Sequence, residues 1–224
     1  MKRVDLKEYN LNSHPHFIGS WLIETHSICD ALINYFESHP GKQLKGLSEA
    51  GRNLDVKNST DLSITPNDIN LMGNEILMEY IERLYECHKD YLVQWPFLGT
   101  IANNLEIGDF NLQRYQVGEH FQQIHTERSG IGTLHRVLAW MTYLNDVDDG
   151  GSTYFSHYDI EVQPKRGLTL IWPAEWTHAH KGNVLRKGSK YIITGWMHFP
   201  SASIRQTAIH SRELGDTPYS KRGF

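Results

Sequence analysis

The sequence has little cysteine and no long apolar run. Its two cysteines, Cys29 and Cys87, cannot build a disulfide framework, and this favours a reducing compartment. No stretch approaches the run of about 18 apolar residues that a membrane-spanning helix needs. Residues 1–16 also lack the apolar segment of a secretory signal. We therefore expect a cytoplasmic protein without a membrane partner.

A strong charge of one sign is also missing. The net charge is −4 with histidine neutral, and no patch of interleaved basic and aromatic residues stands out. Nucleic acid is therefore not an expected partner. The chain of 224 residues is 39% hydrophobic and 21% charged, which is ordinary for a soluble globular protein with a single domain.

The first hundred residues are predicted to be mainly helical. Residues 17–37 place apolar side chains close to a helical period. A second helical stripe begins at Pro66 and continues to residue 96, and Thr60–Ile64 is a candidate strand between the two. We expect residues 1–104 to form a largely helical support region.

From residue 105 the pattern changes to short runs rich in β-branched and aromatic residues, separated by Gly, Asp and Asn. The candidate strands are residues 111–117, 121–127, 134–144, 152–155, 160–164, 168–172, 177–183 and 190–199. Such a series predicts a mainly β fold, a double-stranded β-helix (jelly-roll or cupin-like barrel) flanked by N-terminal helices. Within a single domain 1–224, residues 105–199 would form the core and residues 200–224 a polar tail.

The histidines and one carboxylate suggest a metal site. Side chains two apart on a strand share a face, so His125 and Glu127 would point together. A third ligand must come from elsewhere, and His178 and His180 are candidates that also share a face. Two imidazoles and one carboxylate fit a mononuclear non-haem Fe(II) oxygenase, and the same donors could serve a zinc hydrolase. An H-x-E pair alone is more often a chance surface pair.

A lysine begins one of the apolar candidate strands. Alternation places Lys190, Ile192, Thr194 and Trp196 on one face of that strand. A lysine that faces into a barrel needs an anionic partner, and a dicarboxylate co-substrate would provide one. The alternative is a lysine at an exposed strand end after Gly188.

Four segments together carry a family pattern. They are RYQVGEHFQQIHTE from Arg114, HRVLAWMTYLNDVDDGGSTYF from His135, V-x-P-x-x-G from Val162, and HKGNVLRKGSK from His180 followed by TGW. This pattern resembles the 2-oxoglutarate/Fe(II)-dependent dioxygenase superfamily, and within it the prolyl 4-hydroxylase-like branch. The resemblance covers roughly residues 105–199. It implies Fe(II), 2-oxoglutarate and O2 as cofactors, with ascorbate as a further candidate.

The resemblance also separates the two candidate histidines. In the family, the distal metal ligand is followed by glycine at the second position and by the anion-binding lysine at the tenth. From His180 these positions are Gly182 and Lys190, whereas from His178 they are His180 and Gly188. The pattern therefore favours His180 as the ligand and leaves His178 as the less favoured alternative.

The metal ligands that the resemblance implies are His125, Glu127 and His180. Glu127 departs from the family, which usually has Asp at this position. Glutamate is still an oxygen donor, one methylene longer, so we expect activity to be retained. A carboxylate here also disfavours a halogenase, in which a halide would occupy that position.

The residues implied to bind 2-oxoglutarate are Lys190, Tyr143, Tyr115 and Trp196. Lys190 and Tyr143 would share its distal carboxylate, Tyr115 would lie near the keto-acid end, and Trp196 would form a wall. Each tyrosine also fits a core aromatic with a satisfied hydroxyl. Arg136 matches an arginine of the family and could be purely structural.

The expected reaction is hydroxylation of a C–H bond with release of succinate and CO2. The substrate would be peptidyl proline in a peptide or protein, or a free amino acid or other small molecule. No catalytic residue beyond the metal ligands is needed. The main rival is a non-catalytic cupin-like module that binds metal or ligand, and Lys190 and Tyr143 argue against it. A metal-dependent hydrolase on the same barrel is a further rival.

Overall fold

The computed structural model describes residues 1–3, 15–23, 26–47, 51 and 53–200. The elements before residue 105 are β1 (Lys2–Arg3), β2 (Gly19–Leu22), α1 (His26–Ser38), η1 (Pro40–Lys42), β3 (Gln43–Lys45), β4 (Thr60–Ile64), α2 (Pro66–Ile69), α3 (Glu75–Gln94) and α4 (Pro96–Ile101). The later elements are β5 (Glu106–Ile107), β6 (Phe110–Gln116), β7 (Phe121–His125), η2 (Ile131–Thr133), β8 (Arg136–Tyr143), β9 (Thr153–Phe155), β10 (Ile160–Val162), β11 (Leu168–Pro173), η3 (Trp176–His178), β12 (His180–Gly182) and β13 (Ser189–His198). The predicted tail after residue 200 lies outside the described residues.

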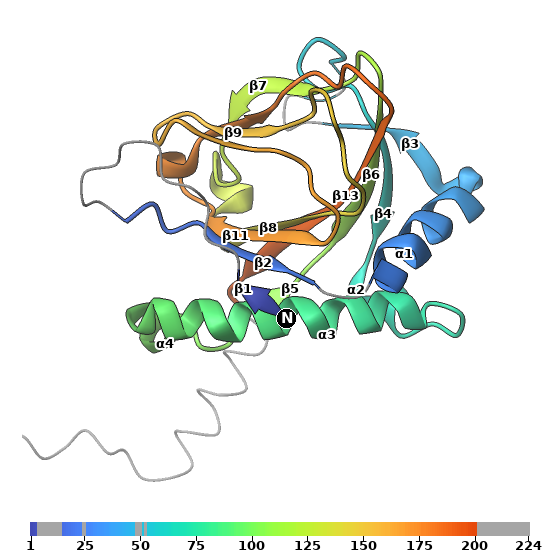
Figure 1. The fold of residues 1–224 in the computed structure, drawn as a ribbon. Helices are drawn as coiled ribbons and strands as arrows, with labels where there is room; N and C mark the ends of the chain where they lie inside the picture. The colour runs from blue at the N-terminus through green and yellow to red at the C-terminus, as the bar shows by residue number, and fades with distance from the viewer. Residues whose placement is uncertain (4–14, 24–25, 48–50, 52, 201–224) are drawn as a thin grey trace, which may run out of the picture.

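Two antiparallel sheets face each other. The major sheet has the order β1-β2-β11-β8-β13-β6-β4-β3, with β5 paired to β13, and the minor sheet has the order β10-β9-β12-β7. Figure 1 shows the minor sheet lying across from the major one, so that the strands wrap around a common interior. Large sheets of antiparallel strands that curl in this way give a double-stranded β-helix. The predicted fold class is therefore confirmed.

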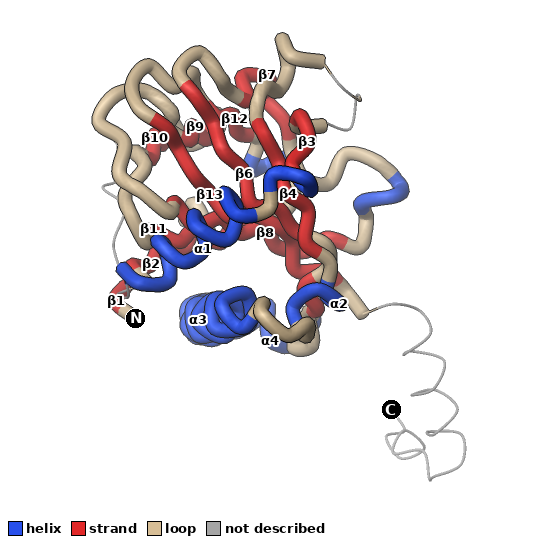
Figure 2. The backbone as a smooth tube through the Cα atoms, turned by 90° about the vertical axis from the view of Figure 1, so that its right-hand side faces the viewer, coloured by secondary structure: helices blue, strands red, loops and turns tan. Residues whose placement is uncertain are grey.

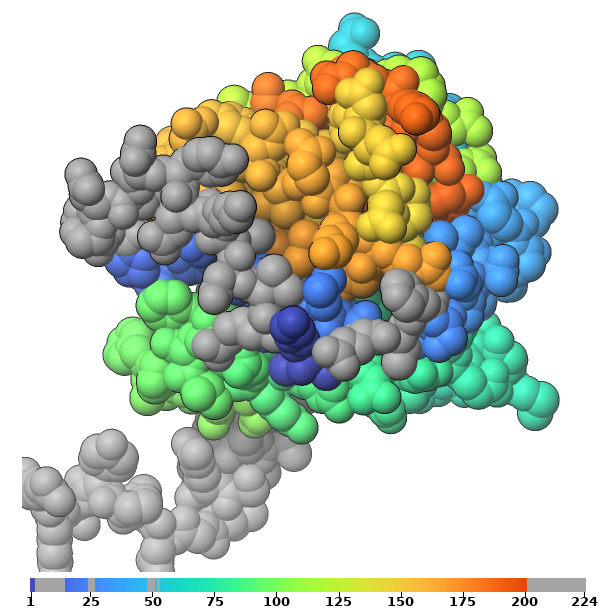
Figure 3. Space-filling view, viewed as in Figure 1, coloured from blue at the N-terminus to red at the C-terminus, as the bar shows by residue number. Residues whose placement is uncertain are grey.

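Helices cover the outer face of the major sheet. Figures 1 and 2 show α1 and α3 packed along this face, and the space-filling view in Figure 3 shows α3 and α4 (green) along one edge of the molecule. Side chains alternate along β8 and β13, so Trp140 and Ile193 join the helices in one core cluster. Met141 and Ile192 belong instead to a second cluster between the sheets. Among the described helices, none combines the length and the apolar composition that a bilayer crossing requires.

The predicted helix over residues 17–37 is wrong at its beginning. α1 starts at His26, and Gly19–Leu22 forms strand β2, which pairs with β11. The reason is tertiary: Trp21 is fully buried, and a Cβ on Gly19 would lie 2.2 Å from the Trp21 ring, so this segment must pass close to its neighbours as an extended chain. A short apolar run cannot by its period distinguish a buried strand from a helix.

The second predicted helix is interrupted. The stripe that begins at Pro66 is divided between α2 and α3, which are separated by residues 70–74. Gly73 has a φ of 91°, a conformation that glycine adopts readily and that a helix does not contain. The predicted strand Thr60–Ile64 is confirmed with these bounds as β4, and it joins the major sheet next to β6.

The close packing at Gly195 predicts a stability effect. A Cβ at this position would lie 2.6 Å from Phe110 Cβ and from Trp140 Cζ2 in the helix-covered core. We expect Gly195→Ala to lower the free energy of unfolding by about 1–3 kcal/mol, because overpacking shifts buried neighbours. Chemical denaturation monitored by circular dichroism measures this change.

The matched control is Gly99→Ala in α4, where a Cβ meets nothing within 4 Å. It should change stability by no more than about 1 kcal/mol, in the stabilising direction. Equal destabilisation by both variants would contradict the proposed packing constraint.

Candidate metal centre and adjoining cleft

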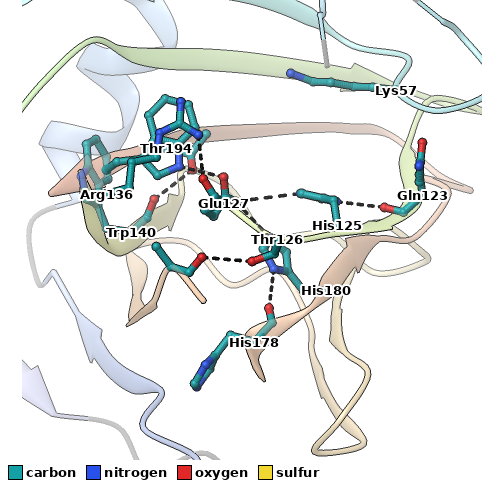
Figure 4. A network of polar contacts seen from close by, with 12 residues as sticks. Lys57, Gln123, His125, Thr126, Glu127, Arg136, Trp140, His178, His180 and Thr194 are labelled. Carbon is teal, nitrogen blue, oxygen red and sulfur yellow. Dashed lines mark hydrogen bonds and ion pairs between the residues drawn. The ribbon is translucent and has the colours of Figure 1, made fainter. Parts of the chain in front are cut away.

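Strand pairing joins two histidines that are far apart in the sequence. His125 ends β7, His180 begins β12, and the two residues are direct antiparallel partners. Glu127 follows just after β7. One ligand atom from each of His125, Glu127 and His180 lies within 4.8 Å of the others. Figure 4 shows these three side chains converging from the two strands.

Backbone carbonyls orient both imidazoles. His125 Nδ1 lies 2.9 Å from Gln123 O, and His180 Nδ1 lies 2.8 Å from His178 O. A carbonyl only accepts hydrogen bonds, so each Nδ1 carries a proton and donates it. In the neutral ring this leaves the Nε2 lone pair free. Both Nε2 atoms can therefore bind a cation.

Glu127 divides its two carboxylate oxygens between different partners. Its Oε1 lies 3.3 Å from His180 Nε2 and 3.9 Å from His125 Nε2. Its Oε2 accepts a hydrogen bond of 2.7 Å from Trp196 Nε1. Only one oxygen thus faces the imidazoles.

The electrostatics of the group favour a charged carboxylate and a neutral imidazole. Burial by itself raises the pKa of Glu127, but the hydrogen bond and charge that His180 provides when protonated, the charge of a protonated His125 and the hydrogen bond from Trp196 outweigh burial and lower the pKa to about 2. Burial, with the neighbouring His180, lowers the pKa of His125 to about 4. One anionic oxygen and neutral imidazole nitrogens are the donors of a two-histidine, one-carboxylate iron site, so these residues fit such a metal.

His178 lies outside this group. It belongs to η3, whereas the strand begins only at His180, so the expectation that His178 and His180 share a strand face is wrong. The His178 Nε2 lies 2.8 Å from His16 O, and Figure 4 shows its ring pointing away from Glu127. Its backbone carbonyl, not its ring, contacts the site through His180 Nδ1.

Lys190 is a buried cation on the wall of the same cleft. Its side chain faces inward as alternation predicts, and the residue is 3% exposed. Its Nζ donates to Gly151 O at 2.8 Å and lies 4.3 Å from the centre of the Tyr115 ring. No carboxylate in the described part of the chain pairs with it, and burial lowers its pKa to about 7. A buried ammonium group without an anion is suited to hold an anionic ligand.

The two predicted tyrosines differ in position. Tyr115 lines the cleft, and its hydroxyl donates to Gln113 Oε1 at 2.8 Å. Tyr143 is fully buried, and its hydroxyl donates to Thr153 Oγ1 at 2.6 Å; of these two, Thr153 lines the cleft. The predicted role of Tyr143 in binding 2-oxoglutarate stays a prediction.

The cleft has a volume of about 1100 Å³ and extends well beyond the metal group. Its far wall contains polar residues that the sequence analysis missed. In this wall Lys57 Nζ lies 2.6 Å from Asp61 Oδ2, and Gln113 Nε2 donates to the same oxygen at 3.2 Å. Asp61 and Ser63 on β4 lie opposite Gln113 and Asn111 on β6. The sequence did contain a signal for this polar wall, because polar residues stand at every second position of both strands and such residues share one face of a sheet.

Comparison with a family model agrees with this geometry. Residues 110–198 match the model of the 2OG-Fe(II) oxygenase superfamily. The range contains His125, Glu127, His180 and Lys190. The resemblance predicted from the sequence is therefore confirmed for this part of the chain, and Fe(II), 2-oxoglutarate and O2 are the cofactors that go with it.

Similar proteins are prolyl hydroxylases. Prolyl 4-hydroxylase subunit alpha-1 of Gallus gallus is 28% identical over 75 residues, which are 30% of this chain and 14% of that protein. The chain thus spans only a small part of that relative. The viral collagen prolyl hydroxylase of Paramecium Bursaria Chlorella virus-1, solved with 2OG, is 16% identical with a TM-score of 0.59, over 82% of this chain and 97% of that one.

A second solved structure has a similar fold. It is the prolyl hydroxylase of Trichoplax adhaerens in complex with a hypoxia inducible factor oxygen degradation domain peptide fragment. It is 14% identical with a TM-score of 0.63, over 90% of this chain and 88% of that one. At these identities the two structures establish the shared fold, and the chemistry depends on the residues of the site.

Metal binding should distinguish the two neighbouring histidines. We expect His180→Ala to raise the dissociation constant of Mn(II) by about 100-fold or more, because it removes an imidazole that faces Glu127. The matched variant His178→Gln should change that constant by less than about threefold, since this ring faces away from the group. Isothermal titration calorimetry measures both constants, and thermal denaturation checks that each variant is folded. Loss of affinity in His178→Gln with retention in His180→Ala would contradict the assignment.

Proposed function

We propose that the chain is a dioxygenase that uses Fe(II) and 2-oxoglutarate to hydroxylate a C–H bond, and the match of residues 110–198 to the 2OG-Fe(II) oxygenase superfamily model supports this. The observation that supports this function most directly is that His125, Glu127 and His180 line the same cleft as the buried ammonium group of Lys190. A metal site alone would fit many functions. A metal site next to a buried ammonium group that no described carboxylate pairs with indicates, more specifically, a metal enzyme with a dicarboxylate co-substrate.

Each residue has a definite task in this proposal. His125, Glu127 and His180 hold Fe(II), with their orientation fixed by the carbonyl and indole contacts. Lys190 binds the distal carboxylate of 2-oxoglutarate. When bound, the metal and the keto acid supply the oxidative chemistry, in which 2-oxoglutarate, O2 and R–H become succinate, CO2 and R–OH.

Aromatic rings support the imidazoles and keep water from them. Phe121 stacks on His125 with ring centres 3.8 Å apart and 12° between the planes. The ring centre of Phe155 lies 5.4 Å from that of His180. Rings packed in this way restrict rotation of both imidazoles and lower the local dielectric, which strengthens their interaction with a cation.

We propose a peptide, with peptidyl proline as the first candidate, as the substrate. The cleft of about 1100 Å³ exceeds the usual range for a single small ligand, roughly 300–1,000 Å³, and so leaves room beyond 2-oxoglutarate. Beyond the metal group it is lined by Ser63, Asn111 and Thr194, which lie side by side on β4, β6 and β13. Side chains of this kind can bond the main chain of an extended peptide. The Trichoplax adhaerens protein was solved with a peptide fragment, which supports this choice.

A free amino acid or another small molecule is the second candidate substrate. The observation in its favour is the buried Lys57–Asp61 pair in the cleft wall, because paired charges of this kind can orient a small zwitterion. Localisation in the cytoplasm and a role for ascorbate stay predictions.

Turnover tests the proposed activity. The purified protein with Fe(II), 2-oxoglutarate, O2 and a panel of proline-rich peptides should form succinate, and a hydroxylated peptide should gain the mass of one oxygen atom. Succinate and oxidised peptide should appear in equal amounts, because one oxygen atom goes to each. Liquid chromatography with mass spectrometry follows both products.

The outcomes separate the activity from the substrate. Turnover that persists after Fe(II) is chelated would rule out the dioxygenase. Consumption of 2-oxoglutarate with no oxygen gain in any peptide would remove peptidyl proline and leave the small-molecule substrate. A protein whose melting temperature with Mn(II) ignores 2-oxoglutarate would instead be the non-catalytic binding module.

The low pKa of Lys190 predicts that 2-oxoglutarate binding weakens as the pH rises. The protonated ammonium binds the carboxylate, and the free protein loses that proton around pH 7. The dissociation constant should therefore be nearly constant below pH 6 and should rise by up to about tenfold per pH unit above 7. Calorimetric titration of 2-oxoglutarate into the Mn(II)-loaded protein between pH 6 and 9 measures it.

Lys190→Arg is the matched control. Arginine stays protonated throughout this range, so its dissociation constant should be flat with pH even if its value is higher. The same rise in both proteins would assign the pH dependence to another group and would count against Lys190 as the anion-binding residue.

A further inference from the structure

Glu127 carries one more methylene than the aspartate usual in the family, and its carboxylate is held from the side away from the imidazoles. Trp196 Nε1 donates to Oε2 at 2.7 Å, while Oε1 faces the two imidazole Nε2 atoms. A glutamate has an additional rotatable bond, so without a restraint its carboxylate could turn either oxygen, or both, towards a cation. The indole provides that restraint.

Arg136 holds both partners of this hydrogen bond. Its guanidinium carbon lies 3.6 Å from the centre of the Trp196 ring, and its Nη1 donates to the backbone oxygen of Glu127 at 2.9 Å. Arg136, Trp196 and Glu127 therefore form a closed ring of three contacts, which we call the indole clamp. Figure 4 shows Arg136 and Glu127 on the same side of the site, across from His125.

The sheet positions the clamp. Trp196 on β13 lies opposite Ala139 on β8, so a small neighbour leaves space for the indole. One step further the register shifts between Met197 and His198, and His198 pairs with Arg136. Such an irregularity re-aims side chains, and here it accompanies the stacking of Arg136 on the indole.

The indole donor at Trp196 differs from those of three other tryptophans in the molecule, whereas Trp21 Nε1 likewise donates to a carboxylate, Asp90 Oδ2, at 2.9 Å. Trp95, Trp140 and Trp172 each have a buried Nε1 with no partner among the described residues. Buried indole nitrogens without an acceptor among the residues that the structure describes therefore occur elsewhere in this fold. Trp196, however, donates to the one carboxylate of the metal group. Trp172 is useful for comparison because it also lines the cleft, with its ring centre 5.2 Å from that of His180.

We propose that the indole clamp makes Glu127 a one-oxygen metal ligand and so keeps a coordination position open for the co-substrates. A hydrogen bond from Trp196 engages Oε2 and lowers its tendency to bind a cation. Two imidazoles and one carboxylate oxygen leave three of six positions open. The co-substrates would need these positions, so a second oxygen from Glu127 would compete with them. Trp196 and Arg136 are positioning residues in this scheme, which rests on the proposed metal site.

The number of water molecules on bound Mn(II) tests the clamp without any turnover. Proton relaxivity of the Mn(II)-loaded protein scales with that number. In Trp196→Phe, the freed Oε2 should displace one of three waters, so the inner-sphere relaxivity should fall by about a third. The dissociation constant of 2-oxoglutarate should rise about tenfold, the scale of one hydrogen bond to a charged group.

Two comparisons show whether the hydrogen bond is the cause. In a Glu127→Asp background the shorter side chain no longer reaches the indole, so adding Trp196→Phe should leave the relaxivity unchanged. Trp172→Phe removes an indole next to the same imidazoles, but one that donates to no described residue, and should also leave the relaxivity unchanged. An equal drop in all of these proteins would overturn the clamp and would indicate general loosening of the site.

A subtler replacement covers the case in which Trp196→Phe does not fold. Incorporation of benzothienylalanine at position 196 keeps the bicyclic shape and replaces the N–H with sulfur. The same fall in relaxivity is expected, and unchanged relaxivity with Mn(II) bound would overturn the proposal. Because this readout needs no 2-oxoglutarate, it can succeed where hydroxylation fails, so the clamp and the proposed function are tested separately.

Discussion

The pairing of β7 with β12 is the interaction on which the site depends. It places His125 directly opposite His180 and so brings together two imidazoles separated by more than fifty residues. Backbone hydrogen bonds fix this register, and a slip by one residue would turn one of the imidazoles to the other face. Glu127 lies outside the strands, two residues after the end of β7, and hydrogen bonds from Trp196 and Arg136 fix its position.

Burial gives the neighbouring residues their chemical character. Lys190 is the second residue of β13, pairs with Tyr115 on β6 and lines the cleft, where a buried ammonium group is poorly solvated. The same burial lowers its pKa and makes an anionic ligand favourable. Stability and function are therefore in tension here, since the site contains a cation that no carboxylate within the described ranges of the chain neutralises. That tension is common where a protein binds a charged ligand.

The polar wall of the cleft follows from the same two-layer architecture. One face of the major sheet packs on α1 and α3 and is apolar, as Trp140 and Ile193 illustrate. The other face lines the cleft and contains Asp61 and Gln113 at matched positions of β4 and β6. A strand with a buried apolar face and a polar inner face is unusual in a simple core, and it marks the part of the barrel that is available to a ligand.

Some of this could be predicted from the sequence because it depends on local patterns. Alternation along residues 190–196 indicated which side chains share a face, and the spacing of His180, Gly182 and Lys190 favoured one histidine over another. The helix predicted over residues 17–37 was wrong at its beginning because its structure there depends on a distant partner. Gly19–Leu22 pairs with β11, and the local spacing of apolar residues does not indicate such a partner. The prediction that His178 and His180 share a strand face was wrong because His178 belongs to η3, and β12 begins only at His180.

The sequence by itself determined the donor types, the fold class and the family pattern, since these depend on residue identity and spacing. Only the tertiary structure decided that Glu127 Oε2 faces an indole and Oε1 faces the imidazoles, that Tyr143 donates to Thr153, and that Lys57 pairs with Asp61 next to the cleft. These contacts join residues from different strands and loops. Their distances are set by sheet register and side-chain packing, which a linear pattern does not encode.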